Sequence, residues 1–117
     1  MDMPTLYHNP RCSKSRQALA LLGDAGITPQ VVLYLETPPT VAALQTLVEK
    51  LGLTRAHDLL RTKEAEYQQA GLTPDASNQE VLEAIHQFPK LLERPILVVG
   101  QRAVIGRPPE NVLELIK

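Results

Sequence analysis

The chain has 117 residues, of which 44% are hydrophobic and 21% charged, a composition that is typical of a globular protein and excludes a disordered one. Its formal net charge of -1 lacks the basic excess typical of nucleic-acid-binding proteins and argues against attraction to acidic membrane surfaces. We therefore expect neither nucleic acid nor a membrane as a partner.

The N-terminus and the cysteine content bear on location. The segment MDMPTLYHNPR lacks the basic start and apolar core of a secretory signal. The longest apolar stretches, such as residues 31–35, are too short to span a bilayer. Cys12 is the single cysteine, so no internal disulfide can form, and we expect a cytoplasmic protein.

The first third of the chain predicts a strand, a helix and a second strand. The β-prone run Thr5–His8 ends at the turn pair Asn9-Pro10. Apolar residues then recur at helical spacing from 18 to 25, and Gly26 supplies a stop. Residues 30–35 are apolar and β-branched enough for a buried strand.

The middle third predicts helices. Thr40 is a good N-cap for an amphipathic helix that ends at Gly52. Shorter helices are predicted over residues 55–61 and 63–70. A further helix over 77–87 begins with Ser77 and has Glu80 three positions later, which is the signature of a capping box.

The last third predicts a hairpin and a helix. Residues 95–99 and 102–105 form strands about the turn Gly100-Gln101, and a final helix follows the Pro108-Pro109 pair. The order is β-α-β, a helical insert, then β-β-α, with the first two strands parallel. We predict an α/β, thioredoxin-like mixed sheet with flanking helices. The prediction is one domain over residues 1–117 with a helical insert at about 40–90.

The segment HNPRCSKSR holds Cys12 after a strand and just before a helix. Unpaired N–H groups and the helix dipole favour a thiolate at such a position, and the same helix start can bind a tetrahedral oxyanion. Nearby His8, Arg11, Lys14 and Arg16 add positive potential. We therefore favour a reactive Cys12 over an inert one.

The sequence argues against two other uses of the thiol and against a metal site. A dithiol site of the C-x-x-C type would need a cysteine where Ser15 stands. A phosphatase-type C-x5-R loop would need arginine in place of Ala18. The histidines are scattered, without the paired Cys/His spacing of metal sites, so we predict no metal.

Three arginines complete the predicted site. Arg94 precedes a buried strand, Arg107 follows the last strand, and Arg61 closes a short apolar helix. Loops at these points can converge on the start of the first helix in a thioredoxin-like sheet. Guanidinium groups suit an oxyanion because they stay charged and donate in pairs.

Five segments resemble the glutaredoxin-coupled arsenate reductase family in order and spacing: NPRCSKSR, YLETPPT at 34–40, LLR at 59–61, ERPI at 93–96 and IGRPPE at 105–110. The resemblance implies a thioredoxin-like fold with a helical insert, cytoplasmic arsenic detoxification and a cis bond at Arg94-Pro95. It implies that Cys12 attacks arsenate, which is then released as arsenite. The implied site has thiolate-supporting residues His8, Ser15 and Arg16 and anion-binding residues Arg61, Arg94 and Arg107.

The implied reductants are external. No bound cofactor is expected; glutathione would attack the adduct on Cys12, and glutaredoxin would resolve the mixed disulfide. The lone cysteine makes an outside thiol necessary.

Two alternatives stay open. The family commonly has Cys-Gly-Thr-Ser-Arg where Cys12-Ser13-Lys14-Ser15-Arg16 stands here, so the protein can be a thiol oxidoreductase acting on another substrate. It can also be an Spx-like regulator that binds RNA polymerase without a dithiol switch.

Overall fold

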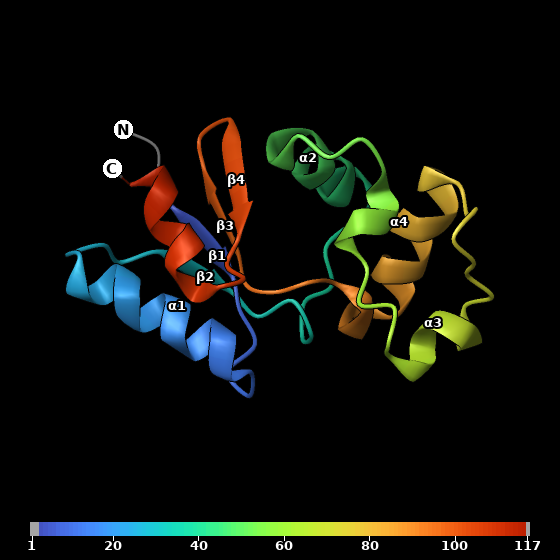
Figure 1. Cartoon of the computed structure of the whole chain (residues 1–117), viewed down its shortest axis with the longest axis horizontal. Helices are drawn as coiled ribbons and strands as arrows, with labels where there is room; N and C mark the ends of the chain where they lie inside the picture. The colour runs from blue at the N-terminus through green and yellow to red at the C-terminus, as the bar shows by residue number, and fades with distance from the viewer. Residues whose placement is uncertain (1–2, 117) are drawn as a thin grey trace. The chain divides into compact units, whose positions relative to one another are not determined.

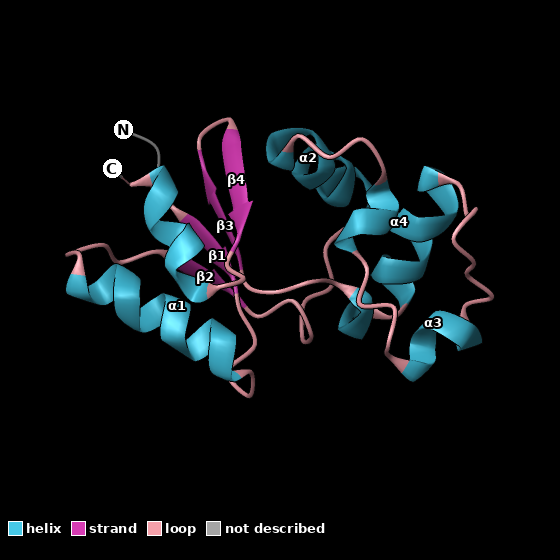
Figure 2. Ribbon diagram, in the orientation of Figure 1, coloured by secondary structure: helices cyan, strands magenta, loops and turns pink. Residues whose placement is uncertain are grey.

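The structure, a computed structural model, describes residues 3–116. The chain divides into two compact units, one made of Met1–Thr37 with Arg94–Lys117 and the other of Pro38–Glu93. Figures 1 and 2 label the elements of each. The prediction of one domain over residues 1–117 stays a prediction, and each unit is described by itself.

The first unit contains a four-stranded mixed sheet in the order β2-β1-β3-β4. Its strands are β1 (Thr5–Tyr7), β2 (Gln30–Val32), β3 (Ile96–Val99) and β4 (Arg102–Ile105). Strand β1 runs parallel to β2 and antiparallel to β3, and β3 forms an antiparallel hairpin with β4. The mixed sheet of the predicted thioredoxin-like α/β fold is therefore confirmed.

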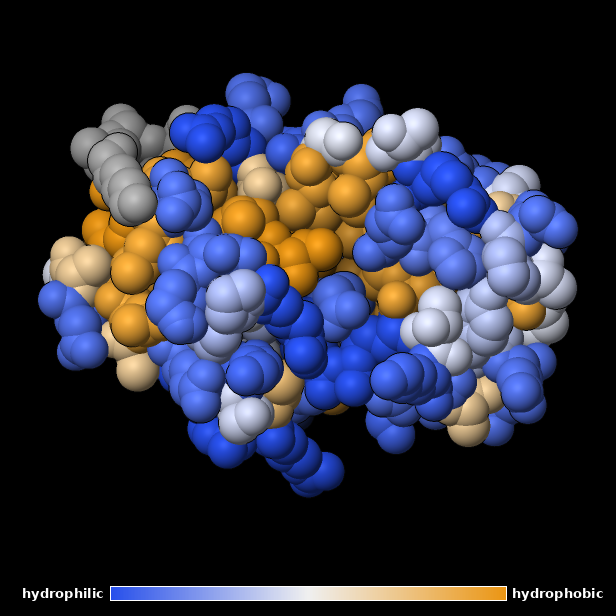
Figure 3. Space-filling model, in the orientation of Figure 1, coloured by the Kyte–Doolittle hydropathy of each residue, from blue (hydrophilic) through white to orange (hydrophobic). Residues whose placement is uncertain are grey.

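Two helices complete the first unit and cover its core. Helix α1 (Ser13–Asp24) contacts the 3-10 helix η3 (Pro109–Leu115). The buried core comprises Leu6, Ala18, Leu22, Leu97 and Val112. Burying one large apolar side chain contributes about 1.5–3 kcal/mol, so this cluster fixes α1 on the sheet. Partly buried apolar residues of η3 surround it, and apolar atoms reach the surface where η3 lies along α1 (Figure 3).

The second unit is helical. It contains α2 (Val41–Leu51), η1 (Ala56–Leu59), α3 (Ala65–Gln69), α4 (Asn78–Gln87) and η2 (Pro89–Leu91). The predicted caps are confirmed: Thr40 Oγ1 accepts the Ala43 N–H at 3.1 Å, and Ser77 forms a capping box with Glu80. Gly52 ends α2 in the left-handed region at φ 70°, where glycine carries no steric cost. Leucines of α2, η1 and η2 pack with α4 in an apolar core.

Three predicted elements are shorter or tighter than expected. Strand β2 stops at Val32 because the Leu33 carbonyl accepts the N–H groups of Glu36 and Thr37, which closes a turn. The helix predicted over 55–61 is a 3-10 helix over Ala56–Leu59. The final helix is also a 3-10 helix, beginning at Pro109, a position where proline's missing N–H costs nothing.

Candidate functional site

Cys12 is held by a tight loop between β1 and α1. Its N–H donates to the Asn9 carbonyl at 2.9 Å, and its own carbonyl accepts the Arg16 N–H at 3.0 Å as α1 begins. Asn9 closes the loop from both sides, because its Oδ1 accepts the Arg11 N–H at 3.0 Å and its N–H donates to Ser15 Oγ at 3.3 Å. The backbone of Cys12 is extended, at φ −95° and ψ 124°. Cys12 is therefore the N-cap residue of α1, as the sequence predicts.

The surroundings of Cys12 favour its thiolate. The side chain is buried, with 7% of its surface exposed, and burial alone raises the pKa of a thiol. That effect is outweighed by the Ser15 N–H, the Arg94 charge, the Ser15 hydroxyl and the Lys14 N–H, so the pKa of Cys12 lies below its ordinary value. Hydrogen bonds to the charged form and a nearby cation are the two interactions that lower an acid's pKa.

Ser15 and Arg16 lie on the first turn of α1 with different surroundings. Ser15 is fully buried, and its hydroxyl contributes to the lowered pKa of Cys12. Arg16 is exposed, and its Nη1 donates to the Pro10 carbonyl at 2.9 Å. The arginine thereby fastens the loop that carries Cys12.

His8 follows β1 and is buried beneath the loop. Its N–H donates to the Val32 carbonyl at 2.9 Å, while its side chain is 6% exposed and its Nδ1 has no hydrogen-bond partner within residues 3–116. Burial, and then the charge of Arg16, lower the pKa of His8. The imidazole is therefore neutral near pH 7. Support of the thiolate by His8 stays a prediction, and it would act through a hydrogen bond or a dipole instead of a positive charge.

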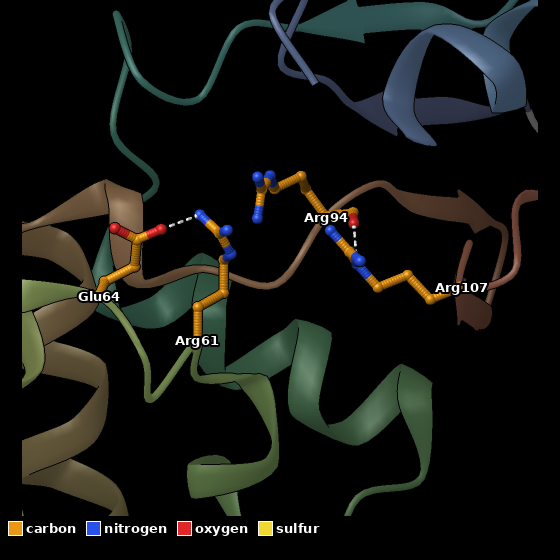
Figure 4. A network of polar contacts seen from close by, with 4 residues as sticks. All are labelled: Arg61, Glu64, Arg94 and Arg107. Atoms are coloured by element: carbon orange, nitrogen blue, oxygen red, sulfur yellow. Dashed lines mark hydrogen bonds and ion pairs between the residues drawn. The ribbon is translucent and has the colours of Figure 1, made fainter. Parts of the chain in front are cut away.

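Arg94 precedes β3, Arg107 follows β4, and a hydrogen bond connects them. The Arg107 Nε donates to the Arg94 carbonyl at 2.9 Å (Figure 4). The Nε and Nη1 of Arg94 are buried without a hydrogen-bond partner within the described chain, and its charge acts on the Cys12 thiol. The structure thus brings Arg94 and Cys12 into electrostatic contact. The peptide bonds Arg94-Pro95 and Arg107-Pro108 are both cis, the first as predicted.

Arg61 belongs to the second unit. Its N–H donates to the Leu91 carbonyl at 2.8 Å, and its Nη1 lies 2.5 Å from Glu64 Oε1 (Figure 4). The guanidinium is half-buried and is paired with a carboxylate. Its predicted role in binding an anion stays a prediction.

Sequence reasoning missed Asn9 and Gly106. The pair Asn9-Pro10 predicts only a turn between strand and helix, although an Asn-Pro pair before a helix also suggests the side-chain turn seen here. Gly106 donates its N–H to the Pro95 carbonyl at 2.8 Å, and a Cβ on it would lie 2.8 Å from Pro95 Cγ. A glycine between a strand and an Arg-Pro-Pro run carries no sequence signal of that close approach.

Residues 3–116 contain no cluster of three or more His, Cys, Asp or Glu side chains arranged for a metal ion. In the same range no helix is long and apolar enough to cross a membrane.

Comparison with known proteins identifies the relatives of this site. The ArsC family matches residues 7–115. The chain belongs to the ArsC family. An arsenate reductase of Neisseria meningitidis serogroup A is 47% identical over 108 residues, covering 92% of each chain. The uncharacterized protein YfgD of Escherichia coli K12 is 50% identical over 112 residues, covering 95% of this chain and 94% of that one.

A solved structure extends the likeness to the fold. The arsenate reductase from Vibrio cholerae aligns with a TM-score of 0.92 and 46% identity over 97% of each chain. ArsC membership and the thioredoxin-like fold are therefore both established, and the Cys12 loop lies within the matched residues.

Proposed function

We propose that this protein is an arsenate reductase that uses the Cys12 thiolate as its nucleophile and draws its second thiol from glutathione, with glutaredoxin as the final reductant. The observation that carries the proposal is the buried Cys12 at the start of α1, with its pKa lowered beside Arg94, whose buried Nε and Nη1 have no hydrogen-bond partner within residues 3–116. A thiolate and an unsatisfied cation together suit attack on a bound oxyanion. The arsenate reductases at 46–47% identity support arsenate as that oxyanion.

The electron balance needs one thiol from outside the chain. Cys12 and glutathione together give up two electrons as they form a mixed disulfide, and arsenate, with As(V), takes them to become arsenite, with As(III), and water. Glutaredoxin then takes over the glutathionyl group by thiol–disulfide exchange, which returns Cys12 as a thiol. Cys12 is the sole cysteine of the sequence, so no second thiol of the same chain can do this.

The remaining residues bind and orient. Arg94 supplies N–H donors and positive charge toward the oxyanion, and Arg107 holds the Arg94 backbone through its Nε. Ser15 and Arg16 keep the Cys12 loop closed around the thiolate. Arg61 enters the proposal as an additional anion ligand on the strength of its position in the sequence motif. A neutral His8 contributes a polar contact beside the loop.

A coupled assay tests the proposal. The protein, arsenate, glutathione and glutaredoxin are mixed, and arsenite is measured together with oxidised glutathione. The wild-type protein should produce arsenite, and Cys12→Ser should produce none while its circular dichroism spectrum stays native. Arsenite formation by Cys12→Ser would overturn the nucleophile assignment. A wild-type protein that reduces a glutathionylated peptide but not arsenate would overturn arsenate as the substrate and favour a thiol oxidoreductase that acts on another substrate.

A further inference from the structure

A pocket lies beside the Cys12 loop, within the first unit. Its volume is about 270 Å³. Its lining includes His8, Asn9, Arg11, Leu33, Leu35 and Glu36. They come from two short segments, one following β1 and one following β2.

The position of the pocket is one that favours ligand binding. Strands β1 and β2 are parallel, so their carboxyl ends meet at one edge of the sheet, where open α/β sheets commonly bind ligands. The hydrogen bond from the His8 N–H to the Val32 carbonyl, 2.9 Å long, keeps the two segments together. The Cys12 N–H bonds to Asn9, a lining residue. A molecule in the pocket therefore lies next to the loop that holds the nucleophile.

Several groups around the pocket lack a partner. His8 is 6% exposed, and its Nδ1 has no hydrogen bond within the described chain. Arg11 and Glu36 are exposed and form no ion pair with each other or with another residue of the range 3–116. Leu33 and Leu35 leave 36% and 37% of their surfaces exposed. The pocket thus offers a cation, an anion, a buried polar atom and apolar walls.

We propose that this pocket binds the peptide thiol that attacks the arsenate adduct on Cys12, namely glutathione. Glutathione carries two carboxylates and one ammonium group, which match Arg11 and Glu36 in sign. Its methylene groups can contact Leu33 and Leu35. A guanidinium pairs with a carboxylate through two parallel hydrogen bonds, so Arg11 is the principal anchor. This assignment rests on the proposed function, because it names where the reducing co-substrate of that reaction binds.

Other occupants fit the pocket less well. An arsenate ion is far smaller than this pocket, and the two leucines offer it no hydrogen bonds. A protein partner needs an interface of about 1,000 Å² or more, whereas this feature is a compact hollow. A small peptide with charges of both signs satisfies the observed groups together.

A binding experiment with S-methylglutathione tests the pocket without any chemistry, because this probe has no free thiol. It is titrated into the wild-type protein, and methyl resonances are followed by NMR. We expect the Leu33 and Leu35 methyl signals to shift, while the signal of Val31, an exposed β2 residue outside the pocket lining, stays in place. Shifts that spread equally over Val31, or no shifts at all, would overturn the assignment.

Matched variants sharpen the experiment. Arg11→Gln should weaken binding of S-methylglutathione about tenfold, the order expected for loss of one charge-assisted hydrogen bond. Arg102→Gln, an exposed arginine on β4, should leave binding unchanged. Equal weakening of binding by Arg11→Gln and Arg102→Gln would show a general charge effect and overturn the assignment of the pocket to glutathione. Leu35→Trp, which fills the hollow, should abolish the shifts, whereas Val31→Trp should not; binding by Leu35→Trp at wild-type strength would overturn the assignment.

Steady-state kinetics separate this inference from the proposed function. Arg11→Gln and Leu35→Trp should raise the KM for glutathione about tenfold, and Leu35→Trp should leave the KM for arsenate unchanged. Arsenate reduction with a wild-type KM for glutathione in both variants would overturn the pocket and leave the function standing. Localised binding of S-methylglutathione by a protein that does not reduce arsenate would uphold the pocket as a peptide-thiol site and overturn the function.

Discussion

Within the described residues, the two units differ in whether they bury polar side chains without a hydrogen-bond partner. Within residues 3–116, the buried side-chain atoms without a hydrogen-bond partner all belong to the first unit: His8 Nδ1 and Arg94 Nε and Nη1. The second unit keeps its polar side chains at or near the surface and pairs them there: half-buried His57 bonds through Nε2 to the Tyr67 hydroxyl at 2.9 Å, and exposed His86 through Nδ1 to the Pro39 carbonyl at 2.8 Å. Asn78 Oδ1 likewise accepts the Ala56 N–H at 3.0 Å.

Under the proposed function, this difference separates the unit that carries the reaction from the unit that contributes mainly to stability. A buried donor or acceptor without a partner costs about 1–3 kcal/mol, and proteins commonly keep such groups where a ligand or a reaction uses them. The first unit retains that cost beside Cys12, while the second unit caps α2 and α4 and, within the described residues, buries no side-chain polar atom without a partner. Substitution of an unpartnered group in the first unit should therefore lower activity without lowering stability. Substitution of a paired group in the second unit, outside the proposed site, should lower stability and leave activity unchanged.

Arg94→Gln should have the largest effect. We expect kcat/KM for arsenate to fall about a hundredfold, because two charge-assisted hydrogen bonds to the oxyanion are weakened. The free energy of unfolding should stay unchanged or rise, since an unpartnered buried charge is removed. Arg55→Gln is the control in the second unit, where the guanidinium donates to the Pro74 carbonyl; it should lose stability and keep its activity. The reverse pattern in urea unfolding and the arsenate assay would refute the comparison.

Gly106→Ala should destabilise the first unit by about 1–3 kcal/mol through overpacking. The new Cβ would lie 2.8 Å from Pro95 Cγ and 3.1 Å from Val112 Cγ1. Gly23→Ala is the matched control, because its Cβ would meet nothing within 4 Å and alanine stabilises a helix by about 0.5–1 kcal/mol relative to glycine. Denaturant midpoints should therefore move in opposite directions, and equal shifts would contradict the predicted clash.

Ser15→Ala should raise the pKa of Cys12. The alkylation rate follows the thiolate fraction, so the wild-type pH profile should have its midpoint below the ordinary thiol value of about 8.5. Losing the hydroxyl removes one interaction with the charged form, which moves the midpoint up and slows iodoacetamide at pH 7. The exposed Ser13→Ala should keep the wild-type midpoint. A Ser15→Ala profile that superimposes on wild type would show that the hydroxyl has no electrostatic role.

Thr40→Ala should have the smallest effect, confined to the second unit. Loss of the N-cap hydrogen bond to the Ala43 N–H should cost about 1 kcal/mol. The alkylation profile of Cys12 should stay unchanged, because the cap touches only α2. Thermal unfolding and alkylation measured on the same sample would detect any coupling, which would contradict the separation of roles.

The sequence predicts the second unit well because its signals are local. Thr40 and Gly52 mark both ends of α2, and Ser77 with Glu80 marks the start of α4. Local propensity misleads at residues 33–35, where apolar residues favour a longer strand and a turn at Leu33 ends β2 instead. Leu33 and Leu35 are therefore exposed.

The candidate site likewise has features that the sequence predicts and features that it does not. The placement of Cys12 at a helix start follows from element order, which a sequence can reveal. The charge of Arg94 on Cys12 and the unpartnered Nδ1 of His8 arise from contacts between distant segments. The burial of these individual atoms depends on side-chain packing, which neither the hydrophobic periodicity nor the motif spacing of a sequence specifies.

The first unit is discontinuous along the chain, and this bears on how the protein is made. Strand β1 pairs with β3, so the sheet cannot close until Ile96–Val99 has left the ribosome. Cys12 emerges early, whereas Arg94 emerges after every residue of the intervening unit Pro38–Glu93. Because domains generally fold as units during synthesis, the helical unit can form first. The nascent chain therefore lacks the Arg94 charge beside Cys12 until the intervening unit has been synthesised.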